Sequence, residues 1–254
     1  MINQVKTVVI AGCTGSMGQQ TVQLIQNLPG FELVGGYAPH AIPQTSDYLV
    51  TNQLAELPQA DIWIDFTVPS VVFQNIKYAI THGYHPVVGT SGLSTSEMHE
   101  LQTLAAAKEL GGLIAPNFGL SAVLLIQFAK QAAKYFPEAE VVEMHHQDKQ
   151  DAPSGTAIAT AKAISASRTH ANDYDEIETI LGARGGKVDG VPIHSIRLPG
   201  YVAHEQVLFG GPGEALTIRQ DSFDRQSFMS GVRLACQKVT NLNTLVVGLE
   251  NILD

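Results

Sequence analysis

The chain has 254 residues, a net charge of −9, 44% hydrophobic residues and 15% charged residues. This composition can bury a sizeable core, which argues against a disordered chain, and the negative charge argues against nucleic acid as a partner. Cys13 and Cys236 form no CxxC pair, and neither a secretory signal nor a membrane-length apolar run is found, so we expect a cytoplasmic protein without disulfides or a membrane partner.

The chain opens with a pattern typical of a dinucleotide site. The apolar run 5–12 predicts a buried strand, "GCTGSMG" follows it, and residues 19–27 predict a helix. In this order Gly12 permits a tight turn, Gly15 lets backbone N–H groups approach a pyrophosphate, and Gly18 lets helix and strand pack closely. Spaced glycines are a weak signal alone, and a strand–helix turn without a ligand is the alternative.

Strands and helices continue to alternate as far as residue 118. The alternation predicts a doubly wound, Rossmann-like parallel sheet, with its ligand at the C-terminal ends of the strands. We expect further strands at 31–37, 61–67, 85–93 and 111–118, and helices at 69–83 and about 94–110. Three loops should reach the ligand edge, at residues 12–18, 89–92 and 115–118.

The pattern changes after Phe118. A helix is expected to begin at Ser154, whose side chain can cap the free N–H groups ahead of it. The other expected elements are a helix at 119–136, a strand at 139–147, a loop at 185–190, three strands within 191–200, 202–210 and 214–222, and a returning helix at 224–239. We therefore predict a dinucleotide-binding domain, residues 1–117 and 228–254, and an α+β substrate domain, residues 118–227, with an open mixed or antiparallel sheet.

The stretch "VVEMHHQDKQDAPSGT" concentrates groups that transfer protons or bind anions. His145 and His146 should point to opposite faces of a strand, so one packed and one surface histidine is the simplest alternative. A metal site is disfavoured because adjacent histidines cannot readily share an ion. The third interpretation is proton transfer beside a carboxylate, with Lys149 as a nearby cation and with Gly155 and Thr156 opening a helix that binds anions.

The segment "EMHHQDKQDAPSGTA" resembles the signature of the 4-hydroxy-tetrahydrodipicolinate (dihydrodipicolinate) reductase family of the bacterial diaminopimelate–lysine pathway. The likeness covers essentially the whole chain, including "VVIAGCTGSMG", "VVGTSGL" and "IAPNFGLSA". It implies an NAD(P)H-dependent oxidoreductase that reduces a cyclic imine dicarboxylate after loss of water. It also implies a homotetramer built through the sheets of the second domain.

The resemblance also implies residue roles. His145 would protonate the enamine that hydride addition leaves, and Lys149 would be a second acid and a cation near the substrate. His146, Gly155 and Thr156 would hold a substrate carboxylate. The cofactor-binding residues would be Gly12, Cys13, Thr14, Gly15, Ser16 and Met17 at the pyrophosphate, and Gly89, Thr90, Ser91, Ala115, Pro116, Asn117 and Phe118 at the nicotinamide.

The sequence departs from many relatives at the predicted ribose site. Those relatives have an arginine where Ser16 stands, and an acidic residue followed by arginine where this chain has Ala38 and Pro39. Neither Ala38 nor Pro39 can bind ribose hydroxyls or a phosphate through its side chain, and His40 is the only nearby side chain that could carry positive charge. We therefore expect dual use of NADPH and NADH.

Two other functions fit parts of the pattern. A different two-domain dehydrogenase would need a nucleophilic cysteine or another acid–base pair, and Cys236 lies in a predicted packing helix. A non-catalytic dinucleotide sensor predicts loss of His145 or Lys149, yet both are present.

Overall fold

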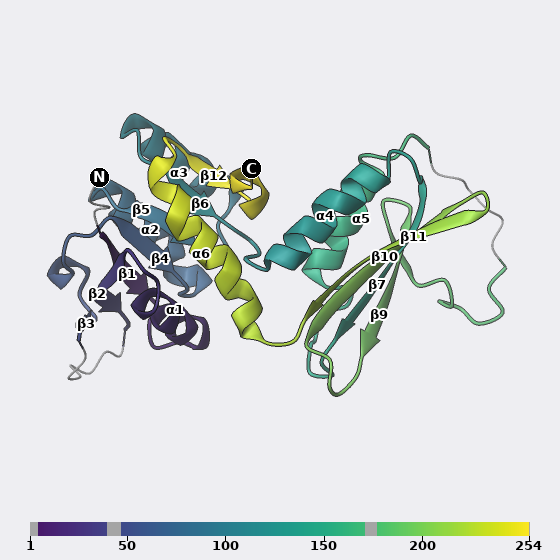
Figure 1. Cartoon of the computed structure of the whole chain (residues 1–254), viewed down its shortest axis with the longest axis horizontal. Coiled ribbons are helices and arrows are strands. Elements are labelled where there is room, and N and C mark those ends of the chain that lie inside the picture. Colours follow the sequence, from purple (N-terminus) through teal and green to yellow (C-terminus); the bar gives the residue numbers. More distant parts are fainter. Residues whose placement is uncertain (1–4, 40–46, 171–176, 254) are drawn as a thin grey trace. The chain divides into compact units, whose positions relative to one another are not determined.

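The computed structural model describes residues 5–39, 47–170 and 177–253. They form two compact units, Met1–Phe118 with Arg225–Asp254, and Gly119–Asp224 (Figure 1). The chain therefore leaves the first unit once and returns to it once.

The first unit contains a parallel sheet with the strand order β12-β6-β5-β4-β1-β2-β3. Its central strands are buried on both faces, as the adjacent and fully buried Val9 and Ile10 of the first strand show. The Rossmann-like parallel sheet is thus confirmed. The strands are β1 (Lys6–Ala11), β2 (Phe31–Tyr37), β3 (Leu49–Thr51), β4 (Ile62–Asp65), β5 (His85–Val88), β6 (Gly112–Ile114) and β12 (Leu245–Val247).

Local sequence explains where the helices of this unit begin and which face they bury. Pro69 occupies the first turn of its helix, where no N–H is needed, and Val72 and Ile76 lie on its buried side. Ser94 and the Glu three residues later form a capping box at the next helix. The helices are α1 (Ser16–Gln26), α2 (Pro69–Thr81), α3 (Thr95–Ala107) and α6 (Met229–Lys238).

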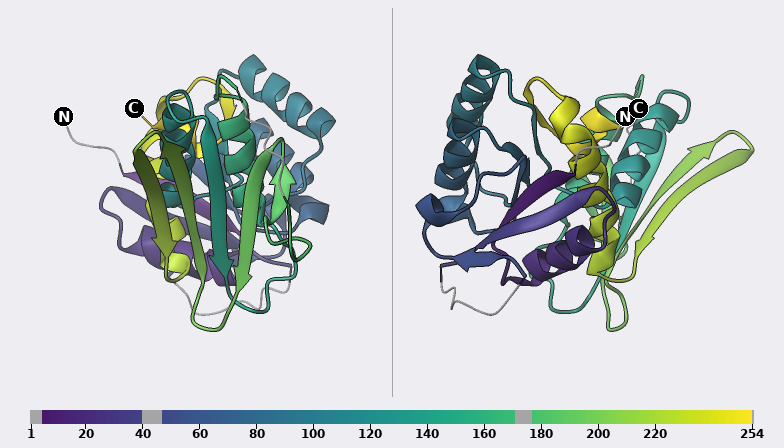
Figure 2. Two further views of the ribbon diagram at one scale, coloured as in Figure 1. Left: turned by 90° about the vertical axis from the view of Figure 1, so that its right-hand side faces the viewer. Right: turned by 60° about the vertical axis from the view of Figure 1, so that its left-hand side comes forward.

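The second unit contains a mixed sheet with the order β11-β10-β7-β9-β8. β7 and β9 are parallel, and the other pairs are antiparallel. The helices α4 and α5 lie side by side on one face of this sheet (Figure 1 and Figure 2). The elements are α4 (Leu120–Ala132), β7 (Glu138–His145), α5 (Gly155–Ser165), β8 (Gly186–Val188), β9 (Val191–Arg197), β10 (Ala203–Gly211) and β11 (Glu214–Ser222).

Several boundaries differ from the sequence prediction. The predicted loop at 185–190 contains β8, because this short segment pairs with the edge of β9. β3 and β12 were not predicted; each has three residues and adds to an edge of the parallel sheet. The strand β7 ends at His145, so His146 lies in the following turn and not on a strand face. The returning helix starts with a 3₁₀ turn, Arg225–Phe228, before α6.

Candidate functional site

The glycine-rich loop joins β1 to α1 by a tight turn, with two close backbone approaches at its glycines. Gly12 has φ +79°, and a Cβ there would lie 2.3 Å from the Phe66 carbonyl oxygen. A Cβ on Gly18 would lie 2.0 Å from the Gly12 oxygen, so helix and strand approach more closely than another residue allows. Gly15 caps α1 and leaves the first N–H groups of the helix available to an anion.

The side chains of this loop divide into buried and exposed groups. Cys13 is buried, and its sulfur packs where a Cβ of Gly36 would otherwise lie. Burial raises the pKa of its thiol, so Cys13 can contribute to an anion site only through its backbone. Thr14 and Ser16 are exposed, and Met17 is half-buried.

The two loops predicted to face the nicotinamide lie beside the glycine-rich loop. A Cβ on Gly89 would strike the Phe66 ring at 2.1 Å, and the Phe66 and Phe118 rings pack edge to face at 5.7 Å. The Ala115 N–H donates to the Val88 carbonyl at 2.9 Å. The structure thus brings together the ends of β1, β4, β5 and β6. Within the two loops Thr90, Ala115 and Phe118 are buried, Asn117 is half-buried, and Ser91 and Pro116 are exposed.

Asp65 at the end of β4 organises these loops, a role that sequence reasoning missed because its only signal was its place at a strand end. Its carboxylate accepts hydrogen bonds from the Thr90 hydroxyl at 2.8 Å and the Thr67 hydroxyl at 2.6 Å. It also accepts from the Asn75 side chain at 3.1 Å. A fully buried carboxylate with this many donors fixes the loop that contains Thr90.

The two described residues directly after β2, Ala38 and Pro39, have no acidic or basic side chain. Ala38 is buried, and its N–H donates to the Thr51 carbonyl at 3.1 Å. Pro39 is exposed and has no N–H. His40, the remaining candidate from the sequence, lies outside the described residues.

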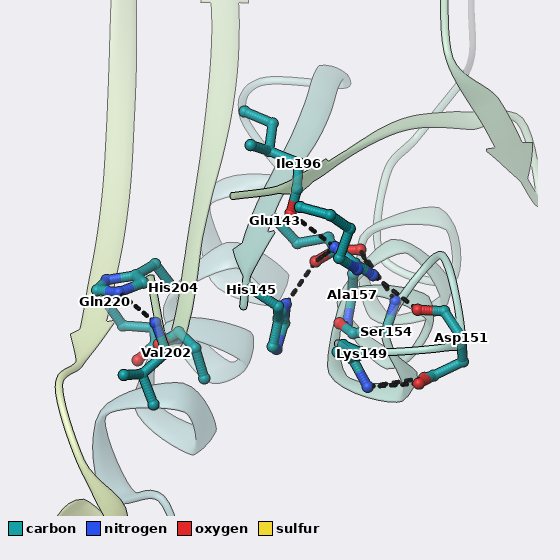
Figure 3. Close-up of polar contacts among 12 residues, drawn as sticks. Glu143, His145, Lys149, Asp151, Ser154, Ala157, Ile196, Val202, His204 and Gln220 are labelled. Carbon is teal, nitrogen blue, oxygen red and sulfur yellow. Dashed lines mark hydrogen bonds and ion pairs between the residues drawn. The ribbon is translucent and has the colours of Figure 1, made fainter. Parts of the chain in front are cut away.

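In the second unit, a buried carboxylate holds the predicted proton donor. Glu143 lies two residues before His145 on β7, and its carboxylate is 2.6 Å from His145 Nδ1 (Figure 3). Arg197, on the adjacent strand β9, donates two hydrogen bonds of 2.8 Å to the same carboxylate. Burial alone would raise the pKa of Glu143, but the hydrogen bonds from His145 and Arg197 outweigh it and lower this pKa to about 2.

Glu143 also connects the histidine to the N-terminus of α5. It accepts a hydrogen bond from the Ser154 N–H at 3.2 Å, and the Ser154 side chain caps the helix by accepting from the Ala157 N–H (Figure 3). The predicted start of this helix is confirmed. No atom lies within 4 Å of a Cβ built on Gly155, so the space beside this helix N-terminus is open.

The other predicted residues of the second unit lie in the turn after β7 and in the first turn of α5. His146 is exposed, and its carbonyl accepts from the Lys149 N–H at 3.2 Å. The Lys149 ammonium pairs with the Asp151 carboxylate at 2.7 Å (Figure 3). This ion pair lowers the net positive charge of the turn. Thr156, on the first turn of α5, is half-buried.

A second buried carboxyl group lies directly opposite Glu143. Glu205 on β10 pairs in register with Glu143 and accepts a hydrogen bond from the Thr160 hydroxyl of α5. Burial raises the pKa of Glu205 to about 7, and the facing Glu143 charge adds to this rise. Glu205 is therefore largely protonated below neutrality.

Other chemistries receive no support from the described residues. No group of three His, Cys, Asp or Glu side chains is arranged there to hold a metal ion. Among these residues no helix has the length and apolar character needed to cross a membrane. Cys236 is fully buried in α6, and burial raises its pKa to about 12, so it is a poor nucleophile.

Comparison with known proteins identifies close relatives over the whole chain. Family models described as "Dihydrodipicolinate reductase, N-terminus" and "Dihydrodipicolinate reductase, C-terminus" match residues 6–118 and 121–253. A 4-hydroxy-tetrahydrodipicolinate reductase of Lactobacillus acidophilus is 59% identical, covering 98% of each chain. One of Limosilactobacillus fermentum is 58% identical, covering 97% of this chain and 99% of its own.

Solved structures agree with this assignment. A dipicolinate-bound dihydrodipicolinate reductase from Paenisporosarcina sp. TG-14 has a TM-score of 0.93 and 41% identity, covering 98% of this chain and 100% of that one. The scyllo-inositol dehydrogenase of Lactobacillus casei has a TM-score of 0.62 at 12% identity, covering 99% of this chain and 93% of that one. The second likeness shows a shared fold alone.

Proposed function

The chain belongs to the dihydrodipicolinate reductase family, and we infer that it is an NAD(P)H-dependent oxidoreductase that reduces 4-hydroxy-tetrahydrodipicolinate to tetrahydrodipicolinate with loss of water. This reaction belongs to lysine biosynthesis through diaminopimelate. A bound nicotinamide supplies the hydride. The residues of this chain bind and orient both reactants and supply the proton.

His145 is the residue that we propose as the proton donor. The observation that carries this proposal is the contact of 2.6 Å between His145 Nδ1 and the buried Glu143 carboxylate. Because this contact holds a proton on Nδ1, Nε2 is the nitrogen that exchanges a proton with the substrate. Lys149 is proposed as a second acid and as a cation for the substrate, with Asp151 holding its ammonium in place until the substrate binds.

The substrate carboxylates are proposed to bind at the turn after β7 and the N-terminus of α5. Gly155 and Thr156 would offer backbone N–H groups and the positive end of the helix dipole, and His146 would add a donor. The open space beside Gly155 supports this role. A small dicarboxylate is the expected ligand, in line with the dipicolinate bound to the Paenisporosarcina relative.

The cofactor is proposed to bind along the carboxyl edge of the parallel sheet. The close approaches at Gly12 and Gly18 and the helix N-terminus after Gly15 fit a pyrophosphate. The remaining loop residues would take part mainly through their backbone, and the loops 89–91 and 115–118 would face the nicotinamide. We propose that both NADPH and NADH are used, because the side chains of Ala38 and Pro39 favour neither the ribose hydroxyls of NADH nor the 2′-phosphate of NADPH.

We also propose a cytoplasmic homotetramer assembled through the sheet of the second unit. The sheet face opposite α4 and α5 carries the exposed Leu208 and the half-buried Val142 and Ile196, which suit burial against another subunit. The two free cysteines, Cys13 and Cys236, are consistent with a reducing compartment.

The experiment that tests the activity follows cofactor oxidation with substrate generated by the preceding enzyme of the pathway. The expected result is substrate-dependent oxidation of NADPH and of NADH. Cofactor binding without turnover would indicate a sensor, and turnover with a sugar or aldehyde alone would indicate a different dehydrogenase.

The substrate class is tested with dipicolinate, which binds without reacting. Lys149→Ala should weaken dipicolinate binding by about tenfold, as expected for loss of a charge-assisted hydrogen bond at a partly exposed site. Lys134→Ala, which removes an exposed lysine of the same unit, is the matched control. Equal binding by wild type and the Lys149 variant would mean that this ammonium has another role.

A further inference from the structure

The proposed cofactor loop lies in a part of the sequence that has no strong cation of its own. Between Lys6 and Lys77 there is neither a lysine nor an arginine, and the whole chain carries a net charge of −9. A dinucleotide brings at least two negative charges to this loop. Backbone N–H groups can meet part of that charge, but a guanidinium or ammonium group would have to come from elsewhere in the chain.

The fold brings such a group to the first residue of α1. Arg225 opens the 3₁₀ turn before α6, and this turn packs against α1. The Arg225 Nη1 donates a hydrogen bond to the Ser16 hydroxyl, across 209 positions of sequence. Both side chains are exposed, and Ser16 directly follows Gly15, the N-cap of the helix. The guanidinium therefore lies beside the N–H groups that would receive a phosphate.

We propose that Arg225 is the phosphate-binding cation of the dinucleotide site. The proposal rests on the function assigned above to residues 12–17. A guanidinium has five N–H donors in a planar fork, and the bond to Ser16 uses one of them. The others remain for two parallel hydrogen bonds to a phosphate, which a lysine cannot form. Ser16, which accepts from Arg225, holds the fork beside the helix N-terminus.

A contact of Arg225 with the pyrophosphate and a contact with the 2′-phosphate of NADPH would affect cofactor binding differently. A contact with the pyrophosphate, which both cofactors contain, would strengthen NADH and NADPH binding alike. A contact with the 2′-phosphate would strengthen NADPH binding alone and would supply the recognition that Ala38 and Pro39 lack. In either case Arg225 contacts a cofactor phosphate and acts from outside the glycine-rich sequence motif.

The test measures the dissociation constants of NADH and NADPH by fluorescence titration for wild type, Arg225→Gln, Arg225→Lys and Arg233→Gln. Arg233 is an exposed arginine of α6, so Arg233→Gln removes the same charge from a neighbouring position. Arg225→Gln should raise the dissociation constant of one or both cofactors by about tenfold. This is near the lower end of the range of effects expected for loss of a charge-assisted hydrogen bond. Arg225→Lys should recover only part of the loss, and Arg233→Gln should change little.

Each result decides the proposal. An increase for both cofactors assigns Arg225 to the pyrophosphate, and an increase for NADPH alone assigns it to the 2′-phosphate. Unchanged binding in Arg225→Gln, or equal losses in Arg225→Gln and Arg233→Gln, would overturn the proposal. Gly15→Val tests the underlying loop assignment separately, because its side chain would obstruct the N–H groups; its Cβ would lie in tight contact, 3.3 Å, with the Gly12 carbonyl oxygen, so circular dichroism first checks that the variant is folded. If Gly15→Val still binds the cofactor normally, the assignment of the loop itself is wrong.

Discussion

The proposed sites of the two units differ in whether backbone groups or side chains form them. In the first unit the proposed cofactor site consists mainly of backbone, with glycines that permit close approach and a helix N-terminus beside them. In the second unit the site consists of side chains held by a buried carboxylate, Glu143, which contacts a histidine, an arginine and a helix cap. A backbone site binds a constant group such as a phosphate, whereas a side-chain network can hold and release a proton.

The largest expected effect comes from removing the proposed proton donor. His145→Ala should lower kcat by roughly 10²–10⁴-fold, the range for a positioned acid. The dissociation constants of NADH and NADPH should be unchanged, because His145 belongs to the other unit. Steady-state kinetics and fluorescence titration measure the two quantities. A kcat near the wild-type value would show that His145 is not the proton donor. The second unit would then have no demonstrated proton-transferring side chain to set it apart from the first.

The pH dependence of stability should distinguish the two facing carboxyl groups of the second unit. The pKa of Glu143 is lowered to about 2, so its contribution is present above the unfolded pKa and is lost as pH falls toward 2. The pKa of Glu205 is raised to about 7, so stability is highest below its unfolded pKa and falls as pH rises through 7. Each shift corresponds to about 3 kcal/mol in the free energy of unfolding.

Two variants test these opposite slopes by urea denaturation from about pH 3 to about pH 8, a range that covers the upper part of the Glu143 transition and the whole Glu205 transition. Glu205→Gln should remove most of the loss of stability that develops as pH rises from about 4.5 to about 7. Glu143→Gln should be strongly destabilised near neutrality and should approach wild type in acid. Glu214→Gln, at an exposed position of β11, is the control. A Glu205→Gln variant with the wild-type pH slope would show that Glu205 titrates normally.

A matched pair of glycine substitutions should separate the two binding sites. Gly15 caps α1 in the first unit, and Gly155 begins α5 in the second. Gly15→Val should weaken cofactor binding by about tenfold and leave dipicolinate binding unchanged, and Gly155→Val should do the reverse. Calorimetric titration with each ligand measures both effects. Loss of both ligands in both variants would indicate unfolding, which circular dichroism would detect.

The smallest expected effect concerns cofactor choice. The kcat/KM values for NADPH and NADH should lie within about tenfold of each other, equivalent to about 1.4 kcal/mol, because Ala38 and Pro39, directly after β2, carry neither an acidic nor a basic side chain. Any preference for NADPH should grow as pH falls and should shrink in His40→Ala. A preference above about a hundredfold, close to 2.7 kcal/mol, would reveal a recognition element at this site.

Sequence patterns predicted the parts of the molecule whose cause is local. The glycine spacing, the Ser154 cap and the helix predicted at 69–83 each follow from neighbouring residues, and the structure contains all three. Glu143 could also have been found, because residues two apart on a strand share a face and it lies two before His145. Arg197 follows only from the pairing of β7 with β9.

Other features depend on contacts that no local pattern records. β8 and β12 are short segments that become strands because an existing strand edge accepts them. Arg225 meets Ser16 only because the chain returns to the first unit after residue 224. When a residue acts at a site formed by distant parts of the sequence, the residues next to it in the chain do not reveal that role.

That return also sets the order in which the molecule can fold during synthesis. β12 completes the parallel sheet by pairing with β6, and Lys6 near the start of the chain donates to Thr240 near its end at 2.6 Å. The second unit, Gly119–Asp224, is one continuous segment and is the first of the two units to be synthesised in full. We expect this unit to fold while the first unit still lacks α6 and β12. A nascent chain paused before Arg225 would therefore expose the apolar surface that α6 later covers, and would be the species most dependent on chaperones.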